Sequence, residues 1–473
     1  MMTRRLSLFL LAAVACTSTT PVARKDWGAL NNQTGKVAIR MKDGTRYNLS
    51  SFQFTESGVE ALAGNHESRR SKSRIGMPVT IQYDSVDVVQ LTRGNSTKTL
   101  AMISIAVTAA YFIVGQTIDN TRPDPVPRPP STSCPFIYSF DGREWRMDSE
   151  TYSGAVARGL ERTDVDNLDY IAAVDGIYRL ALANEADESE YTDQLSLMVA
   201  EHPADTRVFP DADGKLHTVT NGVQPVSIRK HNLVSAPAKT RWDLTFNRPK
   251  GDHLSLVLRV RNTDAVPFVH LQLMNILGED VYSWYREVNT NPDAAARTLR
   301  WYTEMAGLQV STAAGKSWRQ HGTVPIVGPV VAKTIVMPVD VSNSEDVVRV
   351  RLESSPMLWN IESAELVAER EAPQAYELEL VRAVDATGQD VASQLRSVDG
   401  RYHVALNGSR VVAEFRGVAA KPGMRQTVLA KTTGHYYANS TDDRKGNTAL
   451  ASRLMTRSTW SQAYFMAQYK LRR

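Results

Sequence analysis

The sequence predicts a mainly β protein, with a small SH3-like barrel, one hydrophobic helix, and then an antiparallel β-sandwich region that contains a short helical insertion. Short runs of alternating apolar and polar residues recur along the chain, and several of them flank an Asp-Gly pair. Such a pair between alternating runs is the strongest short-range signal for a β-hairpin. The 473 residues are 42% hydrophobic and 22% charged, which is typical of a folded protein with several domains.

The chain begins with the pattern of an export signal. Arg4 and Arg5 precede an apolar stretch, and the small residues Ala13-Val14-Ala15 come directly before Cys16. This order of a basic start, an apolar stretch and small residues predicts a signal peptide over residues 1–15.

The end of this signal resembles the lipobox of bacterial lipoproteins, in which a small residue precedes the cysteine that receives diacylglycerol. The resemblance implies that Cys16 is acylated, that membrane lipid is a partner of the chain through this residue, and that the protein is anchored in the bacterial cell envelope. The chain departs from the lipobox at Ala13, where leucine is favoured. The alternative is a secreted protein that is cut at the same bond and has a free thiol.

A lipid tether and a small barrel are predicted next. Residues 16–35 are expected to form a flexible tether, because they begin with a run of Thr and Ser. The barrel is predicted over residues 36–98, and its clearest hairpin has Asp43-Gly44 between alternating residues at 37–41 and 46–49. A high density of short strands is typical of such a barrel, and further strands are expected at residues 52–54, 59–62, 79–83 and 86–91.

Residues 99–118 contain no charged side chain and are just long enough, as a helix, to cross the hydrocarbon layer of a membrane. We predict a membrane helix, with a buried or membrane-surface helix as the alternative. A lipid on Cys16 and a crossing here would place the following region in the cytoplasm. The Lys and Arg excess before the segment would instead place the barrel there. The side of the membrane on which the C-terminal region lies therefore stays open.

The remaining chain is predicted to be mostly β. Five prolines between positions 123 and 130 make residues 119–133 a stiff linker and a domain boundary. A sandwich region is expected over residues 134–368, with Pro338 in an edge strand, and a C-terminal β region over 369–437. Four Asp-Gly pairs predict hairpin turns, and these are Asp141-Gly142, Asp175-Gly176, Asp213-Gly214 and Asp399-Gly400.

Two segments of this region have helical features. Apolar side chains at mixed spacing indicate helical structure over residues 269–287, and Asn291-Pro292-Asp293 predicts the start of a short helix over 294–299. Residues 438–473 are polar and basic, with a few large apolar side chains. They are predicted to be a tail, with a docking helix as the alternative.

Three stretches have a distinctive local sequence. They are Cys-Pro-Phe-Ile-Tyr-Ser-Phe-Asp-Gly at 134–142, Gly-Leu-Glu-Arg-Thr-Asp at 159–164 and Glu-Tyr-Thr-Asp at 190–193. With these stretches the chain resembles a group of uncharacterised bacterial envelope proteins, in which a lipoprotein signal, a small barrel and a hydrophobic segment precede the same Cys-Pro-Phe opening. The resemblance runs from Cys16 to about Tyr437. It implies architecture and location, and it brings no catalytic residues.

Few residues have a spacing that is typical of known chemistry. A valine stands at position 310 where a phosphate-binding loop needs glycine, so Ala314-Gly315-Lys316 is predicted to be a hairpin turn. Asp211-Ala212-Asp213-Gly214 lacks the glutamate of an EF-hand calcium loop, and the acidic run over residues 185–193 is interpreted as a solvated edge rather than a calcium site. No zinc spacing and no nucleophile elbow occur, so no metal and no cofactor are predicted.

One candidate surface site remains, and it consists of Glu161, Arg162, Asp164 and Glu188. Its carboxylates could face each other, or Glu150, across a cleft as in a glycosidase. The other interpretation is that the segment from Glu161 to Asp164 holds a loop by local ion pairs. Tryptophans could stack on sugars, although most tryptophans of a β-sandwich lie in its core. The candidates are Trp145, Trp242, Trp284, Trp301, Trp318 and Trp359.

The charge balance excludes one class of partner. Lys and Arg number 55 against 51 Asp and Glu, so the net charge of +4 provides no field of the kind that attracts nucleic acid. The anchoring signal, together with the absence of catalytic spacing, predicts a binding or structural module with a protein or cell-wall partner rather than an enzyme. The alternatives are a glycan-binding or glycan-hydrolysing domain, and a subunit of a membrane complex.

Overall fold

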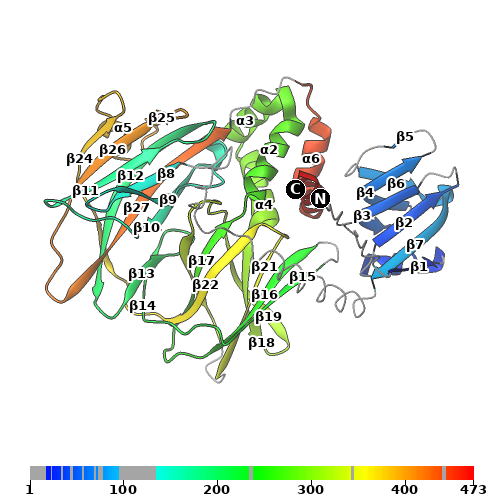
Figure 1. Cartoon of the computed structure of the whole chain (residues 1–473), viewed down its shortest axis with the longest axis horizontal. Coiled ribbons are helices and arrows are strands. Elements are labelled where there is room, and N and C mark those ends of the chain that lie inside the picture. The colour runs from blue at the N-terminus through cyan, green and yellow to red at the C-terminus, as the bar shows by residue number, and fades with distance from the viewer. Residues whose placement is uncertain are drawn as a thin grey trace, which may run out of the picture. The chain divides into compact units, whose positions relative to one another are not determined.

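The computed structural model confirms a mainly β fold with several antiparallel sheets and a few helices (Figure 1). The predicted signal peptide, Cys16, the predicted membrane helix 99–118 and the predicted linker 119–133 lie outside the described residues. The described residues belong to two compact units, one before and one after the linker. They are residues 17–22, 24–32, 36–42, 46–55, 58–68, 71–72, 78–94, 135–233, 238–341, 346–438 and 444–472.

The N-terminal unit is one antiparallel sheet in the order β1-β7-β2-β3-β4-β5, with β6 beside β4. The predicted pairing of residues 37–41 with 46–49 is confirmed, since β2 pairs with β3, whereas the predicted turn residues Asp43 and Gly44 lie outside the described residues. The end strands do not pair with each other among the described residues, so a closed SH3-like ring is not seen there. The strands are β1 (Thr17–Val22), β2 (Lys36–Met41), β3 (Arg46–Phe54), β4 (Gly58–Ser68), β5 (Ser71–Lys72), β6 (Pro78–Gln82) and β7 (Val86–Gly94).

The predicted tether is wrong for residues 17–32. Strand β1 pairs with β7, and two 3-10 helices, η1 (Arg24–Asp26) and η2 (Gly28–Asn32), follow it. Burial of Trp27 and Leu30 explains this, because both side chains join the apolar core of the sheet. The indole nitrogen of Trp27 also donates a hydrogen bond to the carbonyl of Val22 at 3.0 Å.

The C-terminal unit contains a first sandwich of two five-stranded sheets. One sheet has the order β24-β26-β11-β8-β9, and the other has β10-β27-β12-β23 with β25 beside β12. Their facing side chains, such as Leu180, Leu197 and Phe415, form one apolar core. The strands are β8 (Phe136–Phe140), β9 (Trp145–Glu150), β10 (Arg162–Asn167), β11 (Ile177–Ala183), β12 (Glu188–Pro203), β23 (Gln374–Glu377), β24 (Leu380–Asp385), β25 (His403–Ala405), β26 (Arg410–Arg416) and β27 (Met424–Ala438).

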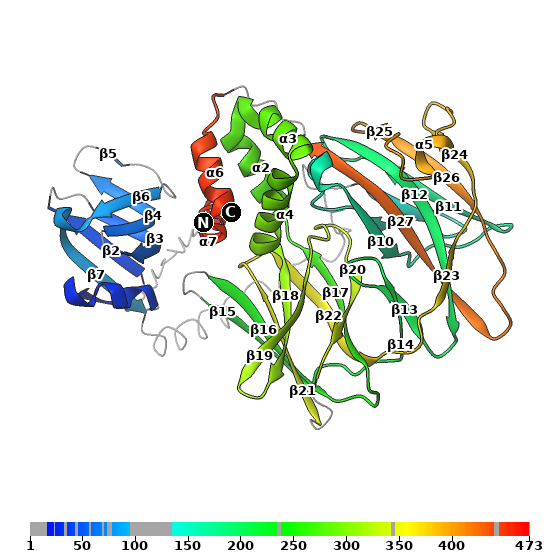
Figure 2. The same ribbon diagram turned by 180° about the vertical axis from the view of Figure 1, so that it is seen from behind.

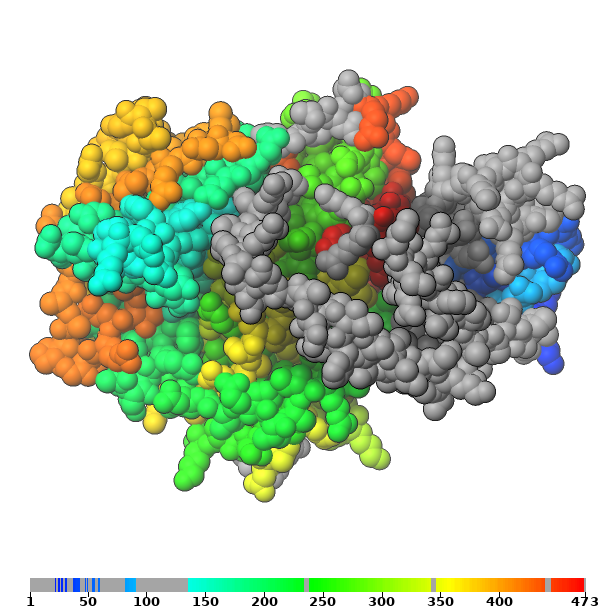
Figure 3. Space-filling view, in the orientation of Figure 1, coloured from blue at the N-terminus to red at the C-terminus, as the bar shows by residue number. Residues whose placement is uncertain are grey.

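The predicted division between a sandwich region at 134–368 and a separate β region at 369–437 is wrong. Late strand β26 pairs with β11, and β27 pairs with β12 along 15 residues. In Figure 3 the cyan atoms of the residues that open this unit lie on the same face as orange atoms of residues near its end. Antiparallel pairing over so large a sequence separation leaves no local signal.

Two further β-sheets share an apolar core with the helices of this unit. One sheet has the order β15-β16-β21-β18-β19, a second has β20-β17-β22, and β13 pairs with β14 beside them. Strand β20 lies at an edge, as Pro338 predicted. The strands are β13 (Arg207–Pro210), β14 (Leu216–Val219), β15 (Ser227–Leu233), β16 (Lys239–Asn247), β17 (Leu254–Asn262), β18 (Leu308–Ala314), β19 (Ser317–Val324), β20 (Lys333–Val339), β21 (Val347–Ser354) and β22 (Trp359–Ala368).

The longer helices form a layer beside these sheets (Figures 1 and 2). The predicted helix start is confirmed, since the Asn291 side chain accepts hydrogen bonds from the N–H groups of Asp293 and Ala294. This helix does not end at Leu299 as expected, because Trp301 and Met305 continue its buried face. The helices are α2 (Ala265–Leu277), α3 (Val281–Thr290), α4 (Pro292–Ala306), α5 (Ala392–Leu395), α6 (Thr448–Thr456) and α7 (Ser458–Arg472).

Residues 444–472 are not the predicted polar tail. Helices α6 and α7 pack against α2 and α4, and their Leu454 and Phe465 belong to the same core as Trp301. None of the helices described here is both long and apolar enough to span a membrane.

Two of the predicted Asp-Gly hairpin turns are confirmed, and one is wrong. Asp141-Gly142 joins β8 to β9, Asp213-Gly214 joins β13 to β14, and Gly315 lies in the β18–β19 turn. Asp399-Gly400 does not close a hairpin, because its N–H groups donate to the carboxylate of Asp193 on another strand.

Candidate functional site

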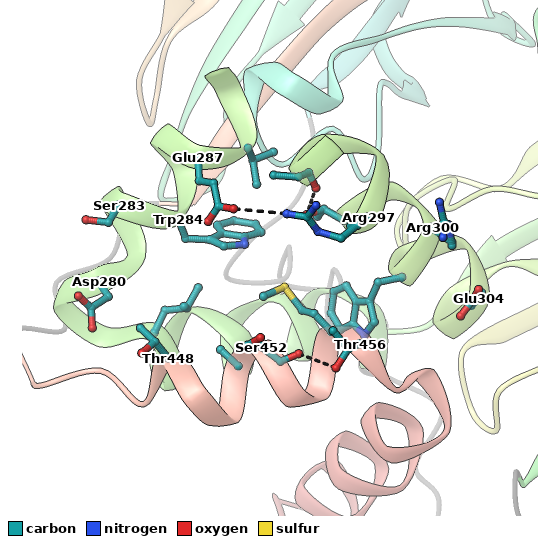
Figure 4. Close-up of a pocket in the computed structure, with 17 residues that line it drawn as sticks. Asp280, Ser283, Trp284, Glu287, Arg297, Arg300, Glu304, Thr448, Ser452 and Thr456 are labelled. Atoms are coloured by element: carbon teal, nitrogen blue, oxygen red, sulfur yellow. Dashed lines mark hydrogen bonds and ion pairs between the residues drawn. The ribbon is translucent and has the colours of Figure 1, made fainter. Parts of the chain in front are cut away.

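A groove between three helices is a prominent concave feature of the large unit. It lies between α3, α4 and α6 and has a volume of about 550 Å³ (Figure 4). Helices α3 and α4 are joined only by Asn291, so they diverge from one point, and α6 approaches from the far end of the chain. The lining residues are Leu277, Asp280, Ser283, Trp284, Glu287, Val288, Ala294, Arg297, Thr298, Arg300, Trp301, Glu304, Thr448, Ala451, Ser452, Met455 and Thr456.

The base of the groove is apolar and rigid. Trp301 is 2% exposed, and its indole nitrogen donates a hydrogen bond to Ser461 Oγ at 2.8 Å. Trp284 is 7% exposed, and its indole nitrogen makes no hydrogen bond to any described residue. A side chain fixed by packing offers a surface that loses little conformational entropy when something binds.

The walls carry charges of opposite sign. Glu287 on α3 and Arg297 on α4 form an ion pair at 3.4 Å across the groove, and both are more than half exposed (Figure 4). Asp280, Arg300 and Glu304 make no ion pair with any described residue. An exposed pair such as Glu287–Arg297 contributes little to stability, so a ligand can replace it at small cost.

Hydroxyl groups line the rest of the wall. Thr298 donates its hydroxyl to the carbonyl of Ala294, and Thr456 donates to that of Ser452, so both are used within their own helices. The hydroxyls of Ser283 and Ser452 are exposed and make no hydrogen bond within the part of the chain that the structure describes. They are free to bind a ligand.

The four residues of the predicted surface site do not come together. Arg162 donates to Asp164 at 3.3 Å, but Asp164 is buried and also contacts Lys333. Glu188 is completely buried on β12. The expectation of an exposed site is therefore wrong for Asp164 and Glu188. Local ion pairing within the segment from Glu161 to Asp164 was the better interpretation.

Glu161 belongs to a different cluster. Its Oε2 lies 2.8 Å from Nδ1 of His435, whose ring stacks on Tyr191 with centroids 4.9 Å apart. Although burial opposes the shift, hydrogen bonds with His435 and Tyr402 hold the pKa of Glu161 below its usual value. The carboxylate is thus committed to neighbouring side chains.

Burial is the main cause of the pKa shifts of two glutamates in the acidic run 185–193. It raises the pKa of Glu188 and of Glu190 well above the ordinary value, and the charge of Glu150 raises that of Glu188 further. Glu150 itself accepts hydrogen bonds from the N–H groups of Val330 and Val331. The run is therefore not the predicted solvated edge at these positions. No set of three or more metal-ligating side chains occurs within the described ranges.

Most of the tryptophans considered as sugar platforms are in the core, as expected for a sandwich. Trp242, Trp284, Trp301 and Trp359 are buried, and only Trp145 and Trp318 are half-buried. The guanidinium of Arg351 covers the Trp318 ring at 3.8 Å from its centroid. The guanidinium of Arg410 also lies over the Trp145 ring, 5.2 Å from its centroid, so a cation already occupies a face of each of these two rings.

Comparison with known proteins adds no function. No family model matches the chain, and no curated protein matches it. A solved structure of infectious bursal disease virus, Gx strain, covers 93% of this chain and 85% of its own, with 8% identity and a TM-score of 0.12. A TM-score this low does not indicate a shared fold. Fold and site define the chain as a two-unit antiparallel β protein with a groove lined by helices.

Sequence reasoning did not find the groove. Helical spacing of Trp284 with Val288, and of Trp301 with Met305, marks the inner faces of α3 and α4. That signal predicts a buried face, but the third wall is contributed by residues 448–456, which are more than 140 positions further along the chain than α4.

Proposed function

We propose that the chain is a lipoprotein of the bacterial cell envelope, anchored through Cys16, and that its large unit binds a partner protein. The observation that supports a binding role is the groove between α3, α4 and α6. It combines an apolar base, walls with charges of opposite sign and unused hydroxyl groups in about 550 Å³. Grooves of this size with a few polar groups placed around apolar surface are typical binding sites.

The partner that fits best is a peptide segment carrying both an acidic and a basic side chain. Charge complementarity supports this, since Arg300 could bind the acidic group and Asp280 or Glu304 the basic one. Val288 and Met455 also line the groove and offer apolar contacts. A glycan ligand would instead need an exposed aromatic face, whereas Trp284 and Trp301 are buried.

The groove can be filled without disturbing the core. Ser452 is exposed on α6 and lines the groove, so Ser452→Trp would occupy the space. Leu299 is 58% exposed on α4 and does not line it, so Leu299→Trp is the matched control. A random peptide library should be panned against the purified full chain. Peptides selected on the unmodified chain should bind Ser452→Trp at least about tenfold more weakly, a loss of about 1.4 kcal/mol, and Leu299→Trp equally well.

The same chain should be incubated with soluble peptidoglycan fragments. Binding of these fragments without selection of any peptide would overturn the peptide proposal in favour of a glycan, and binding of neither probe would overturn a binding role for the groove.

Anchoring has its own test. Mass spectrometry of the mature protein should find an acylated Cys16 and, in Cys16→Ser, a chain without the acyl groups. An intact Met1 on the mature chain would contradict the anchor.

A further inference from the structure

A buried ion cluster joins the first sandwich to the second pair of sheets. The Nζ of Lys333, at the start of β20, lies 2.6 Å from Asp164 Oδ2 and 3.7 Å from Asp166 Oδ2 on β10. Lys333 is 3% exposed and the two aspartates are 7% and 6% exposed. An amine and a carboxyl group are thus held in contact, away from water.

The carboxyl group of Asp164 is held by other donors as well. The N–H of Tyr152 donates to its Oδ2 at 3.1 Å, and Arg162 donates to its Oδ1 at 3.3 Å. These donors orient the carboxyl group toward the amine. Arg162 also places a positive charge beside the oxygen that would become negative if the carboxyl carbon were attacked.

A second carboxyl group lies beside the amine and can exchange protons. Burial raises the pKa of Asp166 to about 7, although the charge of Lys333 opposes the shift. Ser149 donates its hydroxyl to Asp166 Oδ2 at 2.6 Å and orients it. Near neutral pH, Asp166 can therefore both accept and release a proton.

We propose that Lys333 and Asp164 condense into an intramolecular isopeptide bond. Two buried ions are costly to keep out of water, and condensation replaces them with a neutral amide. The water that is released can leave to the solvent. Contact between the two groups also removes the entropic cost of bringing them together.

The reaction balances without any other reactant. Although burial opposes both shifts, the ion pair holds the pKa of Lys333 above its ordinary value and that of Asp164 below it, so the first proton transfer, from Lys333 to Asp164 Oδ2, is uphill. The neutral Nζ then attacks the Asp164 carboxyl carbon to form the C–N bond. Arg162 stabilises the negative charge on Oδ1. Asp166 takes a second proton from Nζ and passes it to Oδ2, which leaves as water when the C–O bond breaks. One N–H remains on the amide, and Asp166 returns to its starting state.

Other lysine pairs in the unit provide an internal comparison. Lys431 lies 2.7 Å from Glu377, and Lys421 lies 2.9 Å from Glu201, but these lysine side chains are 31% and 60% exposed. Water solvates such ions and stabilises the separated charges. We expect both pairs to remain ionic.

The test is a peptide digest of the purified and denatured full chain, read by tandem mass spectrometry. The peptides that contain Lys333 and Asp164 should appear as one branched peptide, lighter by one water than their sum, while Lys431 and Glu377 appear in separate peptides. In Lys333→Met the branched peptide should be absent. In Asp166→Asn the fraction of unlinked chain should rise at least about tenfold, because proton transfer slows.

Recovery of Lys333 and Asp164 only in separate, unmodified peptides from the unmodified protein would overturn the proposal. This measurement needs no variant, so it decides the matter even if Lys333→Met does not fold.

Discussion

The indole nitrogen of Trp301 on α4 donates a hydrogen bond to the hydroxyl of Ser461 on α7 at 2.8 Å, and both side chains are buried. Ser461 in turn donates to the carbonyl of Leu454 at the end of α6. One hydroxyl therefore links three helices, two of which were expected to be a polar tail.

Ser461→Ala should reduce the free energy of unfolding by about 1–3 kcal/mol, because it leaves the indole N–H of Trp301 buried without an acceptor. Urea unfolding followed by tryptophan fluorescence measures the change. Thr459→Ala on the same helix is the control, since Thr459 is exposed. Equal stability of the two variants would show that the hydrogen bond contributes nothing.

Glu188→Gln should make the stability of the large unit less sensitive to rising pH. Burial raises the folded-state pKa of Glu188, so the folded chain keeps a proton that the unfolded chain releases above about pH 4.3. The stabilisation is complete below that pH and is lost as pH rises through the folded-state pKa, at about 1.4 kcal/mol for each pH unit in between.

Urea unfolding at a series of pH values tests this prediction. The advantage of Glu188→Gln over the unmodified chain should grow as pH rises, because glutamine carries no charge. Glu371→Gln, at an exposed position, should show no such trend. A constant difference across the pH range would contradict a raised pKa at Glu188.

Gly159→Ala should separate helix α3 from the first sandwich. A Cβ at this position would lie 2.0 Å from the carbonyl oxygen of Val288, and a backbone atom in a helix cannot easily move aside. We expect a loss of about 1–3 kcal/mol in the free energy of unfolding. Gly28→Ala provides the control, because its Cβ would meet nothing within 4 Å. Thermal unfolding by circular dichroism would reveal the difference, and equal melting temperatures would show that the contact is not tight.

Local chemistry explains which features could be predicted. The helix start at Asn291-Pro292 and the hairpin at Asp141-Gly142 depend on residues next to each other in the chain, so their signals survive in the sequence. The Asp399-Gly400 turn has the same composition, yet Asp193 binds its N–H groups from 206 residues away. A tertiary contact decided that turn, and no local pattern reveals it.

The candidate site was harder to predict than the fold. Each wall of the groove has an ordinary amphipathic pattern, and only the approach of α6 to α3 and α4 creates the space. Asp164 and Lys333 show the same limit, since they lie 169 residues apart in sequence and each resembles a surface residue when taken alone.

Strand β27 lies between β10 and β12 in its sheet, although those two strands are formed from residues 162–203 and β27 from residues 424–438. The ribosome therefore releases β10 and β12 long before it makes the strand that joins them. A chain that stops between β12 and β27 would leave the facing edges of both strands open to aggregation.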